Sequence, residues 1–522
     1  MTDASHRAPS PTSTAPSSLS GEVEHLDVLV IGAGISGLGA ARYLATELPR
    51  KSFTILEARN SIGGTWDLFR YPGVRSDSDL YTFGYGFKPW RDKETIASAS
   101  RILHYLRETA EENGLLERVR FRHRVTRAEW STVTARWLVH VQVESPEGQV
   151  ERLISARWIF CGGGYYRYDE GYTPAFPGRD RFVGKVIHPQ HWPEDFEYAG
   201  KKIVVIGSGA TAVTLGPALA ESAQHVTLLQ RTPSYIMPIP RSDRIATLLK
   251  RALSAERAHA AIRAKYVAQQ RLVWKLCQRF PQTARKFIRR TNARLLPTGY
   301  DVDTHFNPPY NPWDQRLCAV PDADLFKSLA AGKVSMVTDH IETFTEAGIL
   351  LKSGRHLDAD VIVTATGLNL QVAGGIELTV DQRPVRYCDT VAYRGLMLSG
   401  VPNFAMSIGY TNASWTLKVG LLCEYFIKLL DYMDTHGHDV AWAVADPDMP
   451  TRPLIDFGAG YIQRSLNDLP RQGPAAPWLM SRDYLDDRKL IRSGPLVDRH
   501  LHFSSTADRG QAGSTSPAST VL

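Results

Sequence analysis

The sequence has 522 residues, of which 43% are hydrophobic, 22% are charged and 10% are aromatic. This length exceeds what one hydrophobic core usually organises, so two or more domains are expected, and the composition excludes a disordered or repeat protein. The net charge of +7 is uneven, because the segment from Arg241 to Leu295 has 15 Lys and Arg against Asp243 and Glu256, and so carries +13.

The two ends of the chain differ from the rest. Residues 1–24 and 503–522 consist mostly of Ser, Thr, Ala, Pro and Gly, so both are predicted to be disordered tails. The first tail lacks the apolar stretch of a signal peptide, and no run of about 18 apolar residues occurs, which disfavours secretion and membrane spanning. The five cysteines are scattered with no CxxC pair, which favours a cytoplasmic protein.

A first nucleotide-binding unit begins near Leu26. A strand (DVLVI), a glycine-rich turn (GAGISG), a helix (LGAARYLATEL) and a second strand (FTILE) follow in order, which predicts a βαβ unit. Gly32 permits the tight turn, Gly34 lets the backbone approach a pyrophosphate, and Gly37 lets the helix pack closely on the strand. Glu57 ends the second strand, where a carboxylate accepts hydrogen bonds from ribose hydroxyls.

A second unit of the same kind begins at Lys202, with strand IVVIG, turn GSGATAV, helix TLGPALAESA and strand VTLLQ. Its turn carries Gly207 and Gly209, with Ala212 in the third position. Gln230 stands where the first unit has an acid, and Arg231 and Thr232 follow. A guanidinium binds a ribose 2′-phosphate that a carboxylate would repel, so this turn favours NADPH over NADH. The alternative for Arg231 is a solvated charge at a strand end.

The rest of the chain predicts the domain organisation. Residues from about 240 to 296 have helical spacing and few breakers, which predicts a helical insertion, and the strand DVIVTATG follows near residue 360. The predicted fold class is α/β, with two Rossmann-like dinucleotide-binding domains and this insertion. The FAD-binding domain comprises 25–162 and 364–500, and the NADPH-binding domain comprises 163–363.

The basic segment 241–295 allows three interpretations. It is a solvated helical face over the NADPH domain, or it attaches peripherally to anionic membranes, because apolar side chains are interleaved with the cations. Nucleic-acid binding is disfavoured, since no recognition fold accompanies the charge.

Two further motifs narrow the chemistry. The absence of a close cysteine pair excludes a disulfide reductase. The segment from Phe182 to Pro193 reads FVGKVIHPQHWP and matches the pattern FxGxxxHxxxW(P/D), and Gly63-Gly64-Thr65-Trp66 is followed by Tyr71-Pro72-Gly73 and Asp77. In these motifs the chain resembles the type I Baeyer–Villiger flavin monooxygenases, and stretches such as GYTNASWTLK resemble the mycobacterial group that activates ethionamide.

The resemblance implies a reaction. NADPH reduces FAD, O2 adds to the reduced flavin, and the C4a-peroxyflavin converts lipophilic ketones to esters or lactones, with sulfide or thioamide oxygenation as a side activity. One alternative is a flavin monooxygenase that mainly oxygenates sulfides or amines. A non-enzymatic alternative is a membrane-docking flavoprotein, but that predicts damaged glycine turns, and both turns are intact.

The resemblance also implies catalytic residues. Arg316, in the sequence WDQRL, matches the family's fixed cation, with Asp77 as its partner, and a structural loop ion pair is the alternative. Relatives often have Lys before this arginine, and here it is Gln315, so the preference for NADPH rests on Arg231 and Thr232.

The remaining positions follow from the same resemblance. His188 is expected to be a hinge and hydrogen-bonding residue rather than an acid or base, and Trp415 to wall the flavin site or to be core. No metal site is predicted. The residues expected to contact FAD are Ser36, Thr65, Trp66, Asp67, Leu68 and Val125. Those expected to contact NADPH are Arg75, Ser76 and Asp77 at the nicotinamide half, and Gly207, Ser208, Gly209, Ala210, Thr211, Ala212 and Val213 at the pyrophosphate.

Overall fold

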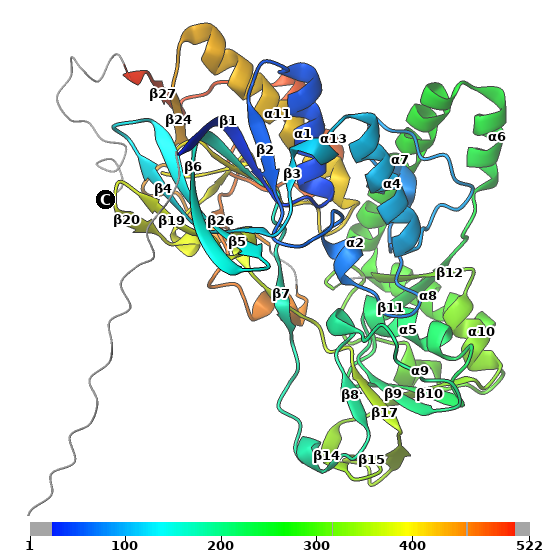
Figure 1. Cartoon of the computed structure of the whole chain (residues 1–522). Helices are drawn as coiled ribbons and strands as arrows, with labels where there is room; N and C mark the ends of the chain where they lie inside the picture. Colours follow the sequence, from blue (N-terminus) through cyan, green and yellow to red (C-terminus); the bar gives the residue numbers. More distant parts are fainter. Residues whose placement is uncertain (1–22, 316, 456–457, 507–522) are drawn as a thin grey trace, which may run out of the picture.

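Two large sheets organise this computed structural model, which describes residues 23–315, 317–455 and 458–506 (Figure 1). The first, of eleven strands, has the order β20-β19-β4-β5-β6-β1-β2-β3, and β21, β22 and β23 join it through a β23–β6 pairing. Its strands are β1 (Glu24–Ile31), β2 (Phe53–Leu56), β3 (Val119–Arg120), β4 (His123–Ser131), β5 (Arg136–Ser145), β6 (Gly148–Cys161), β19 (Glu377–Val380), β20 (Arg383–Val385), β21 (Ala392–Tyr393), β22 (Met397–Leu398) and β23 (Phe404–Met406).

Helices cover one face of this sheet. They are α1 (Ile35–Glu47), α4 (Ala99–Glu112), α11 (Trp415–His436) and α13 (Tyr484–Ser493). Leu38 and Leu44 of α1 pack with Leu422 and Phe426 of α11, all of them fully or almost fully buried. Helix α11 ends at Gly437, whose left-handed conformation (φ 69°) closes the last turn. The parallel strands β6, β1 and β2 lie beneath these helices, with their carboxyl ends at one edge.

The second sheet is the predicted parallel one, with the order β13-β10-β9-β17-β8. All of its pairings are parallel. Most residues of these strands are apolar and buried, as expected when helices or loops cover both faces. The strands are β8 (Lys185–Ile187), β9 (Lys202–Ile206), β10 (His225–Gln230), β13 (Val334–Thr338) and β17 (Val361–Thr364). Helices α5 (Ala210–Leu219), α9 (Val302–His305) and α10 (Asp324–Ala330) and the antiparallel strands β14 (Ile341–Thr345), β15 (Gly348–Leu351) and β16 (His356–Asp358) accompany them.

The chain passes between the two sheets twice, and the two passages pair with each other. Strand β7 (Tyr166–Gly171) leads out of the first sheet, β18 (Leu368–Leu370) leads back, and they form an antiparallel pair. The chain rejoins the first sheet at β19 and not at residue 364, because β17 ends there in the second sheet. The predicted boundary at 364 therefore falls at the start of this connector.

The predicted helical insertion consists of α6 (Arg244–Ala252), α7 (Ala255–Arg279) and α8 (Pro281–Leu295), which lie on the right in Figure 1. Helix α7 packs on α3 (Leu80–Phe83). The half-buried Arg263 donates hydrogen bonds to the carbonyls of Tyr81 (2.6 Å) and Gly84 (2.8 Å), and Gln270 donates to Asp79 (2.7 Å). The insertion is thus fastened to the first sheet's unit by hydrogen bonds in its interior.

The described chain extends into both predicted tails. Glu24 begins β1, and β27 (Leu501–Ser504) pairs with β24 (Val440–Ala443), so Phe503 is ordered by packing against Tyr432 and His438. The prediction was wrong at these edges because it weighed composition and not pairing partners. The remainder of the predicted tails, residues 1–22 and 507–522, lies outside the described residues. None of the described helices is long and apolar enough to cross a membrane.

Candidate active site

One cavity of about 1530 Å³ lies where the two sheets present the carboxyl ends of their strands. Open parallel sheets bind ligands at this edge, since the helices that follow the strands start there. The predicted site residues that line it are Gly32, Gly34, Ser36, Glu57, Thr65, Trp66, Leu68, Arg75, Ser76, Asp77, Val125, Gly207, Ser208, Gly209, Ala210, Thr211, Arg231 and Thr232. Residues that the sequence places in two separate units therefore face one space.

The first turn has the backbone that a phosphate group needs. Gly32 adopts φ 92°, and a Cβ on Gly37 would lie 1.8 Å from the carbonyl oxygen of Gly32, so helix and strand touch only because Gly37 has no side chain. Gly37 itself lies behind the cavity wall. Helix α1 begins at Gly34 without a side-chain cap, which leaves its first N–H groups for an anionic ligand.

Glu57 is held in place by the turn. Its carboxylate accepts hydrogen bonds from the backbone N–H groups of Ala33 (2.7 Å) and Arg59 (2.9 Å). The residue is buried yet lines the cavity, which suits a fixed acceptor for ribose hydroxyls.

The Gly63-Gly64-Thr65-Trp66 signature packs directly on this turn. Gly63 donates its N–H to the carbonyl of Ala33 (2.9 Å), and the hydroxyl of Thr65 hydrogen-bonds that of Tyr168 (3.1 Å). Asp67 does not line the cavity. Its carboxylate accepts hydrogen bonds from Arg59 and Ser61, both at 2.5 Å, which places it in the support of the turn.

The second turn repeats the geometry with one change. Gly207 has φ 143°, and a Cβ there would lie 2.3 Å from the carbonyl oxygen of Ala365, whereas a Cβ on Gly209 would meet open space. Helix α5 starts at Gly209, again without a side-chain cap. Ala212 and Val213 are buried behind the turn, in the core of the second unit, so they support it from behind.

Two neighbouring polar residues at the end of β10 have different surroundings. Gln230 is 2% exposed and donates hydrogen bonds to the carbonyl of His305 and the hydroxyl of Thr338, both at 2.9 Å, so its side chain turns into the protein. Arg231 is exposed, lines the cavity and forms no ion pair with any described residue. The cation, and not the residue in the acid's position, is therefore the group presented to a ligand.

The Tyr71-Pro72-Gly73 signature joins the two turns. Tyr71 is buried against the second unit, burial raises its hydroxyl pKa to about 12, and that hydroxyl interacts with Thr211 of the second turn. Gly73 has φ 77°, and a Cβ there would lie 2.7 Å from the Cβ of Ala218 in α5. A segment of the first unit is thus fitted against the helix of the second.

The residues after this signature have partners of their own. Arg75 forms an ion pair with Asp324 of α10, and the hydroxyl of Ser76 donates to the carbonyl of Ser78 (2.7 Å). Asp77 lines the cavity. Arg316 lies outside the described residues, so its pairing with Asp77 stays a prediction, while the neighbouring Gln315 lines the cavity.

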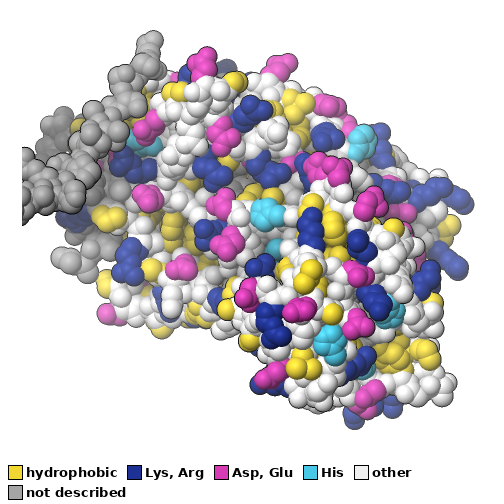
Figure 2. Space-filling view, turned by 60° about the horizontal axis from the view of Figure 1, so that its bottom comes forward, with side chains coloured by type: hydrophobic (Ala, Val, Ile, Leu, Met, Phe, Trp, Pro, Cys, Tyr) yellow, Lys and Arg dark blue, Asp and Glu magenta, His cyan; other side chains and the backbone are white. Residues whose placement is uncertain are grey.

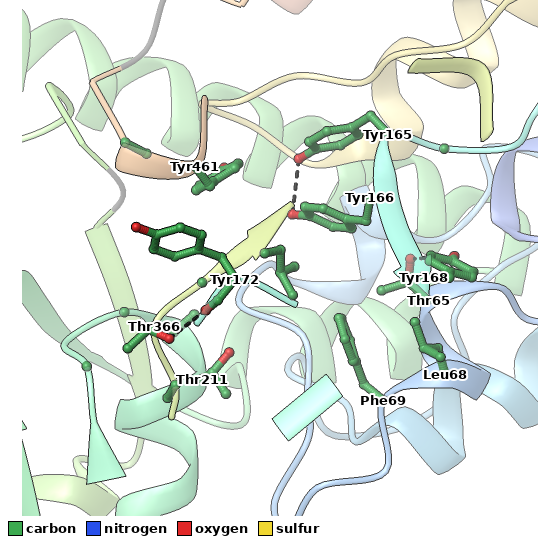
Figure 3. Close-up of a pocket in the computed structure, with 18 of the residues that line it drawn as sticks. Thr65, Leu68, Phe69, Tyr165, Tyr166, Tyr168, Tyr172, Thr211, Thr366 and Tyr461 are labelled. Carbon is green, nitrogen blue, oxygen red and sulfur yellow. Dashed lines mark hydrogen bonds between the residues drawn. The ribbon is translucent and has the colours of Figure 1, made fainter. Parts of the chain in front are cut away.

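Several aromatic side chains complete the cavity and were not predicted. Figure 3 shows four tyrosines around the same space as Leu68, Phe69 and Thr211. They are Tyr165, Tyr166, Tyr172 and Tyr461. The signal for three of them is the sequence GGGYYRYDEGY directly after β6, because residues that follow a strand of a parallel sheet lie at its ligand edge. Tyr461 comes from a distant part of the chain and carries no such signal.

Trp415 connects these aromatics with the first turn. Its ring stacks on Tyr165, with centroids 5.1 Å apart, and its Nε1 donates a hydrogen bond to the hydroxyl of Ser36 (3.0 Å). Elsewhere in the cavity wall, the guanidinium carbon of Arg464 lies 3.4 Å from the ring centroid of Tyr172. Trp415 therefore belongs to the cavity wall, which was one of the two expectations for it.

His188 of the linker fingerprint fastens the connector. Its Nε2 hydrogen-bonds the carbonyl of Gly367 (3.1 Å), and its Nδ1 accepts from the N–H of Gln190 (3.2 Å). A Cβ on Gly171 would lie 2.0 Å from its ring, so β7 passes directly against it. Burial lowers the pKa of His188, and the residue does not line the cavity, which confirms a hydrogen-bonding role at the connector.

Known proteins share this chain's sequence and fold. Residues 26–373 match the family model described as flavin-binding monooxygenase-like. The chain is 52% identical over 484 residues to the FAD-containing monooxygenase EthA of Mycobacterium tuberculosis, covering 92% of this chain and 98% of that protein. It is 46% identical over 488 residues to the probable FAD-binding monooxygenase AlmA of Acinetobacter baylyi, covering 93% and 97%.

Solved structures give the same architecture. An oxidized steroid monooxygenase bound to NADP matches with a TM-score of 0.69 at 22% identity, and an open cyclohexanone monooxygenase matches with 0.70 at 20%. Each comparison covers 92% of this chain and 100% of the other. At these identities the likeness is one of fold, and it confirms the predicted α/β class with two dinucleotide-binding units.

Proposed function

This chain belongs to the flavin-binding monooxygenase-like family, so we propose that it is an FAD-containing, NADPH-dependent monooxygenase of the Baeyer–Villiger type. The observation that carries the proposal is that two helices, α1 and α5, begin at the same cavity. Each follows a glycine, and neither has a side-chain cap at its N-terminus. Two such helix starts fit two dinucleotides whose reactive ends meet. The proposed substrates are O2 and lipophilic ketones, which become esters or lactones, with sulfides and thioamides as side substrates.

The residues fit the two cofactors in different ways. The start of α1 would bind the pyrophosphate of FAD and Glu57 its ribose, while Trp415 and Tyr165 offer flat apolar surface. The start of α5 would bind the pyrophosphate of NADPH, and Arg231 its 2′-phosphate. When bound, FAD supplies the redox and oxygen-transfer chemistry.

In catalysis the protein would orient the cofactors and the substrate, exclude water from the cavity and provide a fixed positive charge. Phe69, Tyr172 and Tyr461 line the cavity with aromatic surface, which favours a lipophilic substrate over water. Arg316, held by Asp77, would supply the fixed cation that stabilises negative charge next to the reacting carbonyl. An Arg316→Ala variant should still reduce its flavin with NADPH but lose ester formation, and full retention of ketone oxidation would refute this role.

Two measurements test the proposal. Anaerobic NADPH should bleach the flavin absorbance of the purified holoprotein, and a protein that keeps its flavin colour under these conditions is not such an enzyme. Mass spectrometry of aerobic reactions with a methyl ketone and an aryl methyl sulfide then identifies the products. Sulfoxide without any ester would favour the alternative, a monooxygenase that mainly oxygenates sulfides or amines.

A further inference from the structure

Exposed apolar side chains are concentrated on the helical insertion. Of the twelve large hydrophobic residues that are exposed in the described chain, eight lie between Ile245 and Phe287. Leu272 and Phe287 are each 59% exposed and Phe280 is 52% exposed. Isolated exposed apolar residues are ordinary, but a group on neighbouring helices marks a surface that contacts something else.

Five of these residues lie on the consecutive helices α7 and α8 and at the corner between them, and we call them the α7–α8 apolar stripe. It comprises Leu272, Val273, Leu276, Phe280 and Phe287. On α7 the spacing i, i+1, i+4 and i+8 puts the first four on one side of the helix, and Phe280 stands at the corner where α8 begins.

Other apolar residues of the same helices are buried. Ile262, Val267 and Cys277 of α7 and Ile288 of α8 are buried, so they pack in the interior. Ile262 precedes Val273 by eleven residues, which is about three helical turns, so the face of α7 that is buried near Ile262 continues into the stripe, where it is exposed.

Cations flank the stripe and are available for binding. Arg279, Lys286, Arg290 and Arg294 are exposed and form no ion pair with a described residue. Other cations of the insertion are already engaged, such as Lys265 with Asp243, Arg271 with Asp483 and Arg289 with Asp303.

The charge beside the stripe differs from that of other faces. Figure 2 shows acidic and basic side chains interspersed over most of the face that it presents, with Lys and Arg gathered at the right edge. In the segment 241–295, which has 15 Lys and Arg, Asp243 is already bound to Lys265, and Glu256 is the only other acid.

We propose that the α7–α8 apolar stripe and its four cations form a peripheral docking surface for an anionic lipid bilayer. The apolar side chains would enter the interfacial layer, and the cations would pair with lipid phosphates. Two copies of this chain would bring like charges together, and a nucleic acid would leave the leucines and phenylalanines in water. The proposal goes beyond the oxygenase activity and does not depend on it, because none of these residues lines the cavity.

Vesicle co-sedimentation of the holoprotein tests this surface. Binding is expected to vesicles of phosphatidylcholine mixed with phosphatidylglycerol, to weaken as salt is added, and to be far weaker with phosphatidylcholine alone. Reversing three cations in Lys286→Glu, Arg290→Glu and Arg294→Glu should weaken binding at least about 100-fold. Leu276→Ser with Phe280→Ser should weaken it roughly 10-fold or more.

Matched controls keep the result specific. The reversals Arg50→Glu, Arg152→Glu and Lys333→Glu change three exposed cations elsewhere, and Val133→Ser with Val183→Ser changes two exposed apolar residues elsewhere. Both control sets should bind vesicles like the natural protein, and flavin content should be equal in all variants.

Three results would overturn the proposal. They are no binding to anionic vesicles at low salt, equal losses in the stripe and control variants, and a stripe variant that turns a dimer into a monomer in sedimentation velocity without any change in vesicle binding. The last result would instead assign the stripe to self-association.

Discussion

We predict that the preference for NADPH depends mainly on the exposed Arg231, next to Thr232, and Arg231→Ala is the sharpest test of the second site. Gln230 cannot replace the cation, because both of its amide hydrogen bonds are made inside the protein. Hydrogen bonds to charged groups contribute about 1.5–3 kcal/mol, which corresponds to an increase of about 10- to 150-fold in the KM for NADPH. The KM for NADH should stay the same, since NADH has no 2′-phosphate.

Steady-state oxidation of both coenzymes gives the measurement. Arg152→Ala serves as the control, because Arg152 is exposed and lies outside the cavity. A gain-of-function variant sharpens the test. Gln315 lines the same cavity, so Gln315→Lys should lower the KM for NADPH and partly restore Arg231→Ala. If Arg231→Ala changes the KM for NADH and the KM for NADPH equally, or changes neither, Arg231 does not bind the 2′-phosphate.

Three further predictions concern the turns and the interior. Gly37→Ala places a Cβ 1.8 Å from a turn carbonyl, so the protein should purify without flavin absorbance, while Ala212→Gly should keep it. Burial lowers the pKa of His259 to about 4. As pH falls below about 6.5 the unfolded chain takes up this proton first, so the free energy of unfolding should fall by up to about 3 kcal/mol toward pH 4. Urea unfolding of His259→Leu should lack this loss, and an unchanged pH profile would contradict the assignment. Lys418 and Asp487 form a buried pair at 2.7 Å, so Lys418→Met should cost about 3–5 kcal/mol, and Lys418→Met with Asp487→Leu should recover most of it in thermal unfolding. Additive losses in the double variant would show that the two residues are not coupled.

Some features of the fold follow from sequence because their requirements are local. Gly32 and Gly37 are needed by the backbone of one turn, and the insertion has helical spacing within itself. The order strand, turn, helix and strand also fixes a parallel unit, which is why both nucleotide units were predicted. The linker motif could also be recognised from sequence, and His188 makes the hydrogen bonds expected of it, one to the nearby Gln190 and one to the distant Gly367.

Other features of the site were not predicted. Asp67 was expected in the cofactor site, yet Arg59 and Ser61 bind it behind the turn. Tyr461 reaches the cavity from the last part of the first unit, and its position depends on how that part packs and not on its neighbours in sequence.

The sequence by itself determined that this protein has two dinucleotide-binding turns, the first followed by the acidic Glu57 and the second by the basic Arg231, and a basic helical insertion. Only the tertiary structure decided that both turns open into one cavity, that Tyr71 and Gly73 fit the first unit against α5, and which cations of the insertion form no ion pair with a described residue. The physical reason is the range of the interactions. Turn and helix formation depend on residues a few positions apart, whereas the direction and the partner of a side chain depend on surfaces that meet only when distant segments pack.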